Sequence, residues 1–214
     1  MNVFVIGSNG QIGRHLVKQL QEHDGHTVTA MVRNKEQAEA LLADGVKAEV
    51  ADLEGPVAGL KEVMSGCDAV VFTAGSGGST GADKTLLIDL DGAVKTMEAA
   101  EAAGIDRYLL VSAIQAHHRE NWNEKIRHYF AAKHYADRML ELSSLNYTIV
   151  RPGGLLNEPG TGKIKAKKDL ERAFIPREDV ARTIVAALDE PNTYRKGFDL
   201  ISGEHTPSEA LKSL

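Results

Sequence analysis

The sequence predicts an α/β protein with a doubly wound, mostly parallel sheet that has helices on both faces. Two observations predict this fold. Short apolar runs alternate along the chain with segments whose apolar residues recur at helical spacing. The apolar runs are nearly continuous, which is typical of parallel strands buried on both faces. A chain of 214 residues is also in the size range of one such domain.

The elements follow in order from local patterns. Residues 3–6 form a continuous apolar run, and apolar residues then repeat at helical spacing from Ile12 to Leu20. β-branched residues indicate a strand over 27–32, and a helix over 35–43 closes at Asp44-Gly45. The later predicted strands are 46–50, 69–72, 107–111 and 147–150, with helices over 82–103 and 124–142.

The alternation loosens after Arg151, and only 64 residues (214 − 150) follow the sixth strand. We therefore expect one domain over 1–214, in which 151–214 form a small substrate-side segment. A helix over 177–189, a strand over 198–201 and a short helix over 208–214 are predicted there. We expect the lysines between them to lie in a solvated loop, with a lid over an anionic substrate as the alternative; these are Lys163, Lys165, Lys167 and Lys168.

The composition excludes several function classes. The chain is 43% hydrophobic and 26% charged, and its net charge of −5 favours neither nucleic acid nor an anionic membrane as partner. The one cysteine, Cys67, cannot form an internal disulfide. No apolar stretch approaches the ~20 residues of a membrane span, and no basic segment precedes the first apolar run. We expect a cytoplasmic protein with a small-molecule substrate, and a homo-oligomer is left open.

The strongest motif follows the first strand directly and begins the first helix. Its glycines allow a tight turn, close approach of a pyrophosphate and close packing of helix on strand. The helix N-terminus then presents unpaired N–H groups to the phosphates. This pattern favours a dinucleotide-binding Rossmann fold over an ordinary turn. The motif is Gly7, Ser8, Asn9, Gly10, Gln11, Ile12 and Gly13.

The second strand predicts which dinucleotide is preferred. A carboxylate that holds a ribose 2′-hydroxyl is expected after this strand, but the chain has Arg33 and Lys35 there. Arg33 suits a 2′-phosphate, so we expect NADP(H) to be preferred over NAD(H), with a solvated surface arginine as the alternative.

Loops after the third and fourth strands also belong to the predicted cofactor site, because strand carboxyl ends line the ligand crevice. Asp52 would accept a hydrogen bond from the adenine amino group, or else cap a helix. The expected residues in these loops are Asp52, Leu53, Thr73, Ala74 and Gly75.

These motifs together resemble the short-chain dehydrogenase/reductase superfamily, in its atypical branch of epimerase/dehydratase-like proteins and NAD(P)H-binding reductases. The matching pieces are 7–13, Arg33, Asp52-Leu53, 73–75, 129–133, the 147–153 run and 177–181. The resemblance implies a cofactor across the strand ends, with Pro152 and Gly153 shaping its nicotinamide end. Members of the branch include reductases, epimerase-like enzymes and redox sensors.

The resemblance implies that the chemistry rests on Tyr129 and Lys133. Four residues apart on a helix, they share one face. An ammonium beside the phenol would lower its pKa, so that Tyr129 acts as general acid or base on a carbonyl or alcohol. The resemblance also implies that Lys133 binds the nicotinamide ribose. A surface tyrosine and lysine are the alternative.

The third catalytic residue is less clear from the sequence. We expect Ser112 to polarise the substrate oxygen, but Ala113 and Ile114 stand where relatives usually carry the Ser or Thr. Ser112 is therefore either catalytic or structural, and Gln115 is a substitute donor.

Two other features have open interpretations. Trp122 lines the substrate mouth or packs a loop, and Asp179 caps a helix or braces Arg177. No metal site is predicted among His117, His118, His128 and His134, because no two of them are at i, i+4 and no carboxylate-backed set is visible.

The expected function is that of an NAD(P)-dependent oxidoreductase of an unidentified small carbonyl or alcohol. One alternative is a non-catalytic NADP-binding redox sensor, and another is a flavin or tetrapyrrole reductase.

Overall fold

The computed structural model describes residues 1–78 and 80–214, and it confirms the predicted α/β Rossmann fold. Eight strands form one sheet in the order β3-β2-β1-β4-β5-β6-β10-β8, parallel throughout except for β8 against β10. They are β1 (Asn2–Ile6), β2 (Thr27–Val32), β3 (Lys47–Val50), β4 (Ala69–Phe72), β5 (Arg107–Val111), β6 (Asn146–Pro152), β8 (Ile164–Lys167) and β10 (Lys196–Ser202). A separate small parallel sheet contains β7 (Gly154–Leu156) and β9 (Phe174–Pro176).

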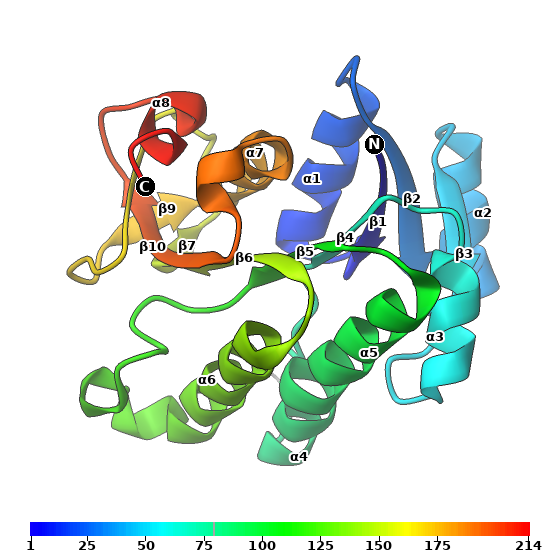
Figure 1. Ribbon diagram of the computed structural model, residues 1–214, viewed down its shortest axis with the longest axis horizontal. Coiled ribbons are helices and arrows are strands. Elements are labelled where there is room, and N and C mark those ends of the chain that lie inside the picture. Colours follow the sequence, from blue (N-terminus) through cyan, green and yellow to red (C-terminus); the bar gives the residue numbers. More distant parts are fainter. Residues whose placement is uncertain (79) are drawn as a thin grey trace.

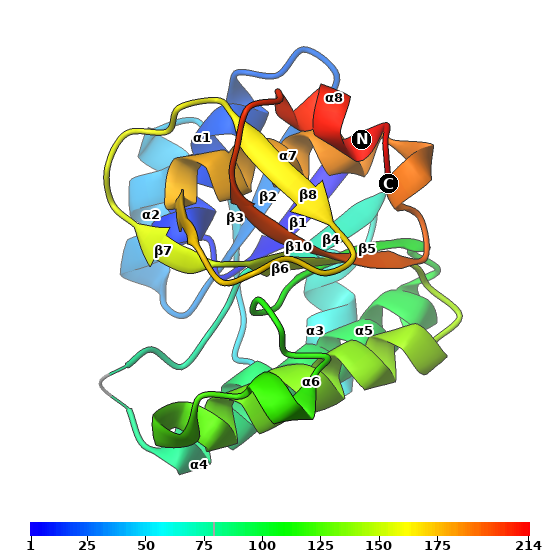
Figure 2. The same cartoon turned by 90° about the vertical axis from the view of Figure 1, so that its left-hand side faces the viewer.

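Helices cover both faces of the large sheet (Figure 1). One core lies beneath α1 (Gln11–Gln21), α7 (Arg177–Leu188) and α8 (Pro207–Leu211). The other lies against α3 (Val57–Met64), α5 (Ala93–Ala103) and α6 (Arg127–Leu142). Figure 2 shows the same layers from the side, with α5 and α6 on the face opposite α1 and α7. The remaining α-helices are α2 (Lys35–Ala43) beside β3 and α4 (Ala82–Lys84). Within the described residues, we find no helix with the length and apolarity to cross a membrane.

The helix predicted over 82–103 is one continuous segment with an irregular middle. It consists of α4, the π-helix η1 (Thr85–Gly92) and α5. Wider π-helical turns are often found at functional sites. Here η1 buries Thr85 and Asp89 toward the protein while Leu86 and Leu87 stay exposed.

The helix α3 has no counterpart in the sequence prediction. It is only eight residues long, contains Gly59, and buries just Leu60 and Met64. An amphipathic pattern of two residues is too short to distinguish from a loop.

The prediction of a loop over the lysines is wrong for residues 164–167. This segment is β8, an antiparallel edge strand in which Ile164 and Ala166 are buried while Lys165 and Lys167 are exposed. Lysines on an edge strand discourage pairing with another sheet, which gives them a structural role. Because Lys167 pairs with Asp199 of β10, this strand is part of the sheet and the alternative of a lid is excluded for it.

Short 3-10 turns join several elements: η2 (Arg119–Asn121), η3 (Glu124–Ile126) and η4 (Pro191–Thr193). The first two lie in the long connection from β5 to α6. The predicted helix over 124–142 therefore begins as a 3-10 turn and becomes α-helical at Arg127.

A buried arginine holds the end of α7 against the sheet. Arg107, at the start of β5, is 6% exposed. Its guanidinium donates to the carbonyl oxygens of Ala187 (2.6 Å) and Leu188 (3.3 Å), and to that of Asn146 at the start of β6 (2.9 Å). These bonds satisfy carbonyl groups that the last turn of a helix leaves unpaired, and the positive charge suits the negative end of the helix dipole.

We expect Arg107→Met to lower the free energy of unfolding by about 3 kcal/mol, because it removes the guanidinium's hydrogen bonds to three carbonyl groups. Urea unfolding followed by circular dichroism measures this loss. Arg127→Met, which removes an exposed arginine, is the control and should change the free energy by less than about 1 kcal/mol. Equal losses in the two variants would contradict this role for Arg107.

Candidate dinucleotide site and active site

The parallel strands bring the predicted site residues to one edge of the sheet. The neighbouring strands β2, β1, β4, β5 and β6 run in the same direction, so the loops at their carboxyl ends are side by side. This edge collects the glycine motif, Arg33, Thr73, Ser112 and Pro152. It is the place where open α/β sheets bind their ligands.

The glycine motif has no room for side chains at two positions. Gly7 has a φ of +82°, and a Cβ there would lie 2.6 Å from the backbone nitrogen of Ala74. A Cβ on Gly13 would lie 2.1 Å from the carbonyl oxygen of Gly7. Gly10 is the N-cap of α1, and no side chain caps this helix. The exposed N-terminus therefore fits a pyrophosphate, which would accept bonds from the first N–H groups of the helix.

Other side chains of the motif support the loop. The Ser8 hydroxyl is buried and donates to the carbonyl oxygen of Met31 on β2 (2.6 Å). Ile12 packs in the core. Asn9 accepts hydrogen bonds from the guanidinium of Arg14, at 2.9 and 3.1 Å. The sequence analysis missed Arg14, although a basic residue directly after the glycine motif was visible.

Arg33 directly follows β2, at the position that the NADP prediction requires. Its side chain is exposed, and the described residues include no acidic side chain within ion-pair distance of it. Its backbone N–H donates to Gln37, and Asn34 caps α2 by accepting from the Gln37 N–H. The geometry leaves the guanidinium available to an anion, and the NADP preference stays a prediction.

Asp52 forms a turn rather than a helix cap. Its carboxylate accepts from the Glu54 N–H (2.9 Å), while α3 begins later, with Pro56 as its N-cap. The alternative of a helix cap is therefore wrong, and the adenine contact remains a prediction. The Leu53 side chain is buried in the core.

The loop after β4 connects the glycine motif to the interior of the site. The Thr73 hydroxyl donates to the carbonyl oxygen of Ile6 (2.9 Å), which fixes this loop on β1. Further along, the Ser76 N–H donates to the buried carboxylate of Asp89 (2.9 Å). A Cβ on Gly75 would lie 3.1 Å from the same carboxylate. The loop thus depends on Asp89, a residue that the sequence analysis did not select.

Lys133 and Asp89 form a buried ion pair. The Lys133 ammonium lies 3.1 Å from an Asp89 carboxylate oxygen and donates to the carbonyl oxygen of Val111 at the end of β5 (3.3 Å). The two residues are 3% and 1% exposed. Burial is the largest single effect and lowers the pKa of Lys133, but the charge and hydrogen bond of Asp89, together with Tyr129 and Asp137, raise it more, so the pKa is raised and the lysine stays charged. A surface location for Lys133 is therefore wrong.

Tyr129 is one helical turn before Lys133, whose ammonium is 5.7 Å from the centre of its ring. Burial raises the pKa of Tyr129, and this exceeds the opposing effect of the Lys133 charge. The predicted lowering of the Tyr129 pKa is therefore wrong in this structure. The main reason is burial, which disfavours the charged phenolate, and the negative charge of Asp89 adds to this effect. Tyr129 is a neutral phenol near pH 7.

Ser112 and Gln115, which both follow β5, differ in whether their side chains have hydrogen-bond partners. The Ser112 hydroxyl is buried and has no hydrogen-bond partner among the described residues. A buried polar group of this kind is unusual without a ligand or water. The Gln115 amide instead donates to the carbonyl oxygen of Leu170 (2.7 Å) and to Asp199 (3.2 Å). Gln115 is therefore occupied structurally, which does not support the prediction of a substitute donor.

Pro152 and Gly153 connect β6 to the substrate-side segment. The carbonyl oxygen of Pro152 accepts from the Ile114 N–H (2.9 Å), and the Gly153 N–H donates to Leu200 of β10 (2.8 Å). A Cβ on Gly153 would lie 2.2 Å from the carbonyl oxygen of Ala173. Their predicted contact with the nicotinamide remains a prediction.

Two of the open interpretations are now decided by contacts. The indole N–H of Trp122 donates to the carbonyl oxygen of Ala116 (3.0 Å), so the residue packs its loop. Asp179 is fully buried and accepts from the N–H groups of Thr161 and Gly162 (2.8 and 2.9 Å). It also pairs with Arg182 rather than with Arg177.

The four histidines considered above do not form one cluster in the structure. His134 contacts the carbonyl oxygen of Ala116, while His117 and His118 both contact Asp169, about 50 positions later in the chain. Burial lowers the pKa of His117, and the two imidazoles lower the pKa of Asp169. The adjacent histidines were the available signal, but Asp169 could not be assigned to them from spacing.

Comparisons with known proteins agree with this geometry. A model of the NAD(P)H-binding family matches residues 7–191. An uncharacterized sugar epimerase of Bacillus subtilis, YhfK, is 58% identical over 214 residues, which is 100% of both chains. A proposed NAD-dependent epimerase/dehydratase of Bacillus halodurans has a solved structure with 41% identity and a TM-score of 0.94, covering 100% of both chains. The oxidoreductase ylbE of Lactococcus lactis has 33% identity and a TM-score of 0.90, covering 100% of this chain and 96% of that one.

Because the ion pair is buried, we expect removal of one charge to destabilise the protein more than removal of both. Lys133→Met should lower the free energy of unfolding by about 3–5 kcal/mol, because it leaves the Asp89 charge buried without a partner. The double variant Lys133→Met with Asp89→Asn removes that charge but keeps an acceptor for Ser76, so most of the loss should be recovered. Urea unfolding of the single and double variants measures the difference.

The exposed pair of Arg138 and Glu141 on the same helix provides the control. Arg138→Met should cost less than about 1 kcal/mol. A double variant at Lys133 and Asp89 that is less stable than Lys133→Met alone would show that the two charges do not compensate each other.

Proposed function

This chain belongs to the NAD(P)H-binding family, and on that premise we propose that it is an NADP-dependent oxidoreductase of a small carbonyl or alcohol substrate. The observation that carries the proposal is the group of polar residues near the carboxyl end of β5, in which Lys133, Asp89 and Ser112 are buried and Tyr129 is partly buried. A neutral Tyr129 lies beside the ion pair of Lys133 and Asp89, and the Ser112 hydroxyl has no partner among the described residues.

The dinucleotide would bind across the carboxyl ends of the strands. The backbone of 7–13 would hold its pyrophosphate, Arg33 its 2′-phosphate, and Asp52 its adenine. Three observations support this arrangement. No side chain caps the N-terminus of α1, the backbone of Gly7 packs directly against the backbone of Ala74, and the Arg33 side chain after β2 is exposed. Pro152 and Gly153 would border the nicotinamide.

Bound NADPH supplies a hydride for the carbonyl carbon of the substrate. Tyr129 would give its phenolic proton to the carbonyl oxygen, which completes the alcohol, and solvent would return a proton to the phenolate. Ser112 would donate a hydrogen bond to the same oxygen. Lys133 would stabilise the transient phenolate charge, while Asp89 keeps the lysine in place and burial keeps the resting phenol neutral. A neutral phenol favours the reductive direction near pH 7.

The names of the similar proteins support a chemistry of this class. Sugar epimerases and dehydratases act at or beside carbon atoms that carry hydroxyl or carbonyl oxygen, and one similar protein is called an oxidoreductase. Since pocket shape determines which substrate enters, fold and motif do not select one compound from this class.

Calorimetry with NADPH, followed by turnover assays over carbonyl and flavin or tetrapyrrole panels, tests the proposal. We expect stoichiometric binding and NADPH oxidation by a carbonyl compound. Binding without any turnover would favour the redox sensor instead. Absence of heat with every pyridine nucleotide would overturn the proposal entirely.

The preference for NADP rests on Arg33. We expect Arg33→Ser to weaken NADPH binding by about 10–100-fold, because a charge-assisted contact with the 2′-phosphate is lost, and to leave NADH binding nearly unchanged. Calorimetry measures both affinities, and Arg138→Ser on α6 is the matched control. If the wild-type protein binds NADH as tightly as NADPH, Arg33 does not have this role.

The proton donor rests on Tyr129. We expect Tyr129→Phe to lower kcat of carbonyl reduction by roughly 10²–10⁴-fold while the Kd for NADPH stays the same. Because burial raises the pKa of Tyr129, wild-type kcat should fall only as pH rises above the ordinary tyrosine value of about 10. Steady-state kinetics against pH measures this. Unchanged kcat in Tyr129→Phe would favour flavin-type reduction, in which no tyrosine acid is needed.

A further inference from the structure

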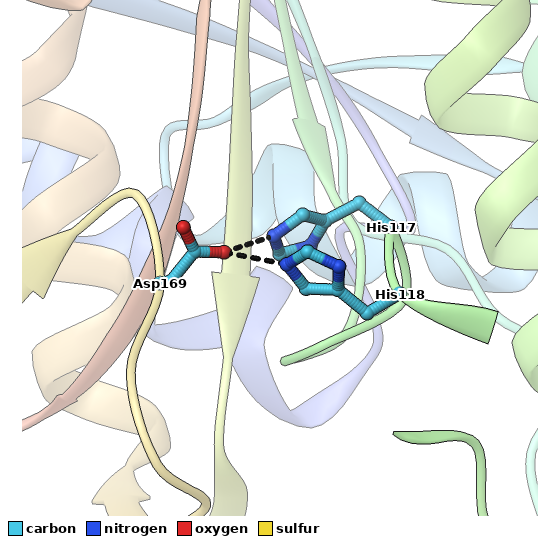
Figure 3. A group of neighbouring side chains, drawn as sticks. All are labelled: His117, His118 and Asp169. Atoms are coloured by element: carbon cyan, nitrogen blue, oxygen red, sulfur yellow. Dashed lines mark hydrogen bonds and ion pairs between the residues drawn. The ribbon is translucent and has the colours of Figure 1, made fainter. Parts of the chain in front are cut away.

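Two loops far apart in the sequence bring three potential metal ligands together. Figure 3 shows His117 and His118, from the connection after β5, with both imidazoles directed at Asp169 in the loop after β8. Their Nε2 atoms lie 2.8 and 2.7 Å from one carboxylate oxygen, Asp169 Oδ1. The three groups belong to none of the contacts proposed for the dinucleotide.

A buried carboxylate holds these two loops in place. Asp199 on β10 is fully buried and accepts from the backbone N–H groups of Gln115 (3.3 Å) and Leu170 (3.1 Å). Gln115 has a φ of +63°, a conformation that few non-glycine residues adopt, and its amide also bonds to Leu170. The backbone two residues before His117 and directly after Asp169 is therefore fixed by the fold, so the cluster does not depend on surface side chains meeting by chance.

The donor set suits a divalent transition metal. Two imidazole nitrogens and one carboxylate oxygen are ligands that zinc and neighbouring transition metals accept, and three protein ligands leave a position for water. The three ligand atoms all lie within 4.8 Å of one another. A tetrahedral ion with bonds of about 2.0–2.2 Å needs ligand atoms about 3.4 Å apart. The carboxylate would have to move by roughly 0.6 Å, and the Asp169 side chain is half exposed.

The contacts of the other imidazole nitrogens provide a second, independent observation. His118 Nδ1 lies 3.4 Å from a Glu120 carboxylate oxygen, and His117 Nδ1 faces Asp199 at 4.0 Å. Histidines that bind metals usually direct their second ring nitrogen at such a group, as an N–H donor. The buried His117 Nδ1 has no hydrogen-bond partner among the described residues.

The tautomers explain why a metal would improve this arrangement. When a neutral imidazole donates from Nε2 to Asp169, its Nδ1 presents a lone pair, here toward Asp199 or Glu120. A metal ion on Nε2 moves the ring proton to Nδ1, where it points at a carboxylate. At both histidines, repulsion between the Nδ1 lone pair and the facing carboxylate is then replaced by attraction between an N–H group and that carboxylate.

We propose that His117, His118 and Asp169 bind one divalent transition-metal ion, with Zn²⁺ as the representative ion. Such an ion would join the loop after β8 to the connection that leads into α6, the helix that carries Tyr129. The site does not require the proposed oxidoreductase activity.

Calorimetric titration of the full-length, tag-free, chelator-treated protein with Zn²⁺ tests this proposal. We expect one site per chain and a melting temperature that rises with Zn²⁺. Losing an outer partner of a ligating histidine usually costs about 10–100-fold in affinity. Glu120→Gln should therefore weaken binding about tenfold, whereas His118→Ala and Asp169→Asn, which remove direct ligands, should weaken it by more than about 100-fold.

His128→Ala is the matched control, because it removes an exposed histidine outside the cluster. It should bind Zn²⁺ like the wild-type protein. Binding that persists in both His118→Ala and Asp169→Asn would show an adventitious site elsewhere. Absence of Zn²⁺ binding in the wild-type protein, with reduced stability in these two variants, would show that the cluster is only a hydrogen-bonded clamp. Either result would overturn the proposal.

Discussion

Three stretches of backbone meet at the beginning of α1 with no space for a side chain between them. The turn after β1 contacts the loop after β4 at Ala74, and α1 passes so close to Gly7 that residue 13 must also be glycine. This approach determines where α1 begins and aims its unpaired N–H groups at the carboxyl edge of the sheet. The loops on the neighbouring strands then line the same edge, so the candidate cofactor site depends on this one contact.

Charge balance determines the character of the candidate active site. A tyrosine and a lysine one helical turn apart suggest a phenol with a lowered pKa. The structure adds a third group, the Asp89 carboxylate from η1. Asp89 compensates the Lys133 charge and binds the loop after β4 through Ser76. The pKa values of Tyr129 and Lys133 are both raised, so a neutral phenol lies beside a charged lysine and is better suited to giving a proton than to taking one. The π-helix matters because it places this carboxylate toward α6.

A second buried carboxylate organises the opposite side of the connection between β5 and α6. Asp199 ties Gln115 and Leu170 together, and these contacts also place the two histidines beside Asp169. The start of this connection, at Gln115, is therefore held by an aspartate of another element, and the Trp122 indole fixes its later part to the carbonyl oxygen of Ala116. This explains why a long connection with only short 3-10 turns keeps a defined path.

The sequence by itself determined the fold class, the glycine turn and most strands and helices, because these follow from periodicity and backbone requirements that are local. The family resemblance also selected Tyr129, Lys133 and Ser112, whose shared catalytic role stays a prediction. It mistook the edge strand β8 for a loop and missed α3, whose patterns are too short to interpret. Only the tertiary structure decided which carboxylate meets which cation, because Asp89 and Asp169 lie 44 and about 50 residues from their partners, and burial, which determines their effect, is a property of the whole fold.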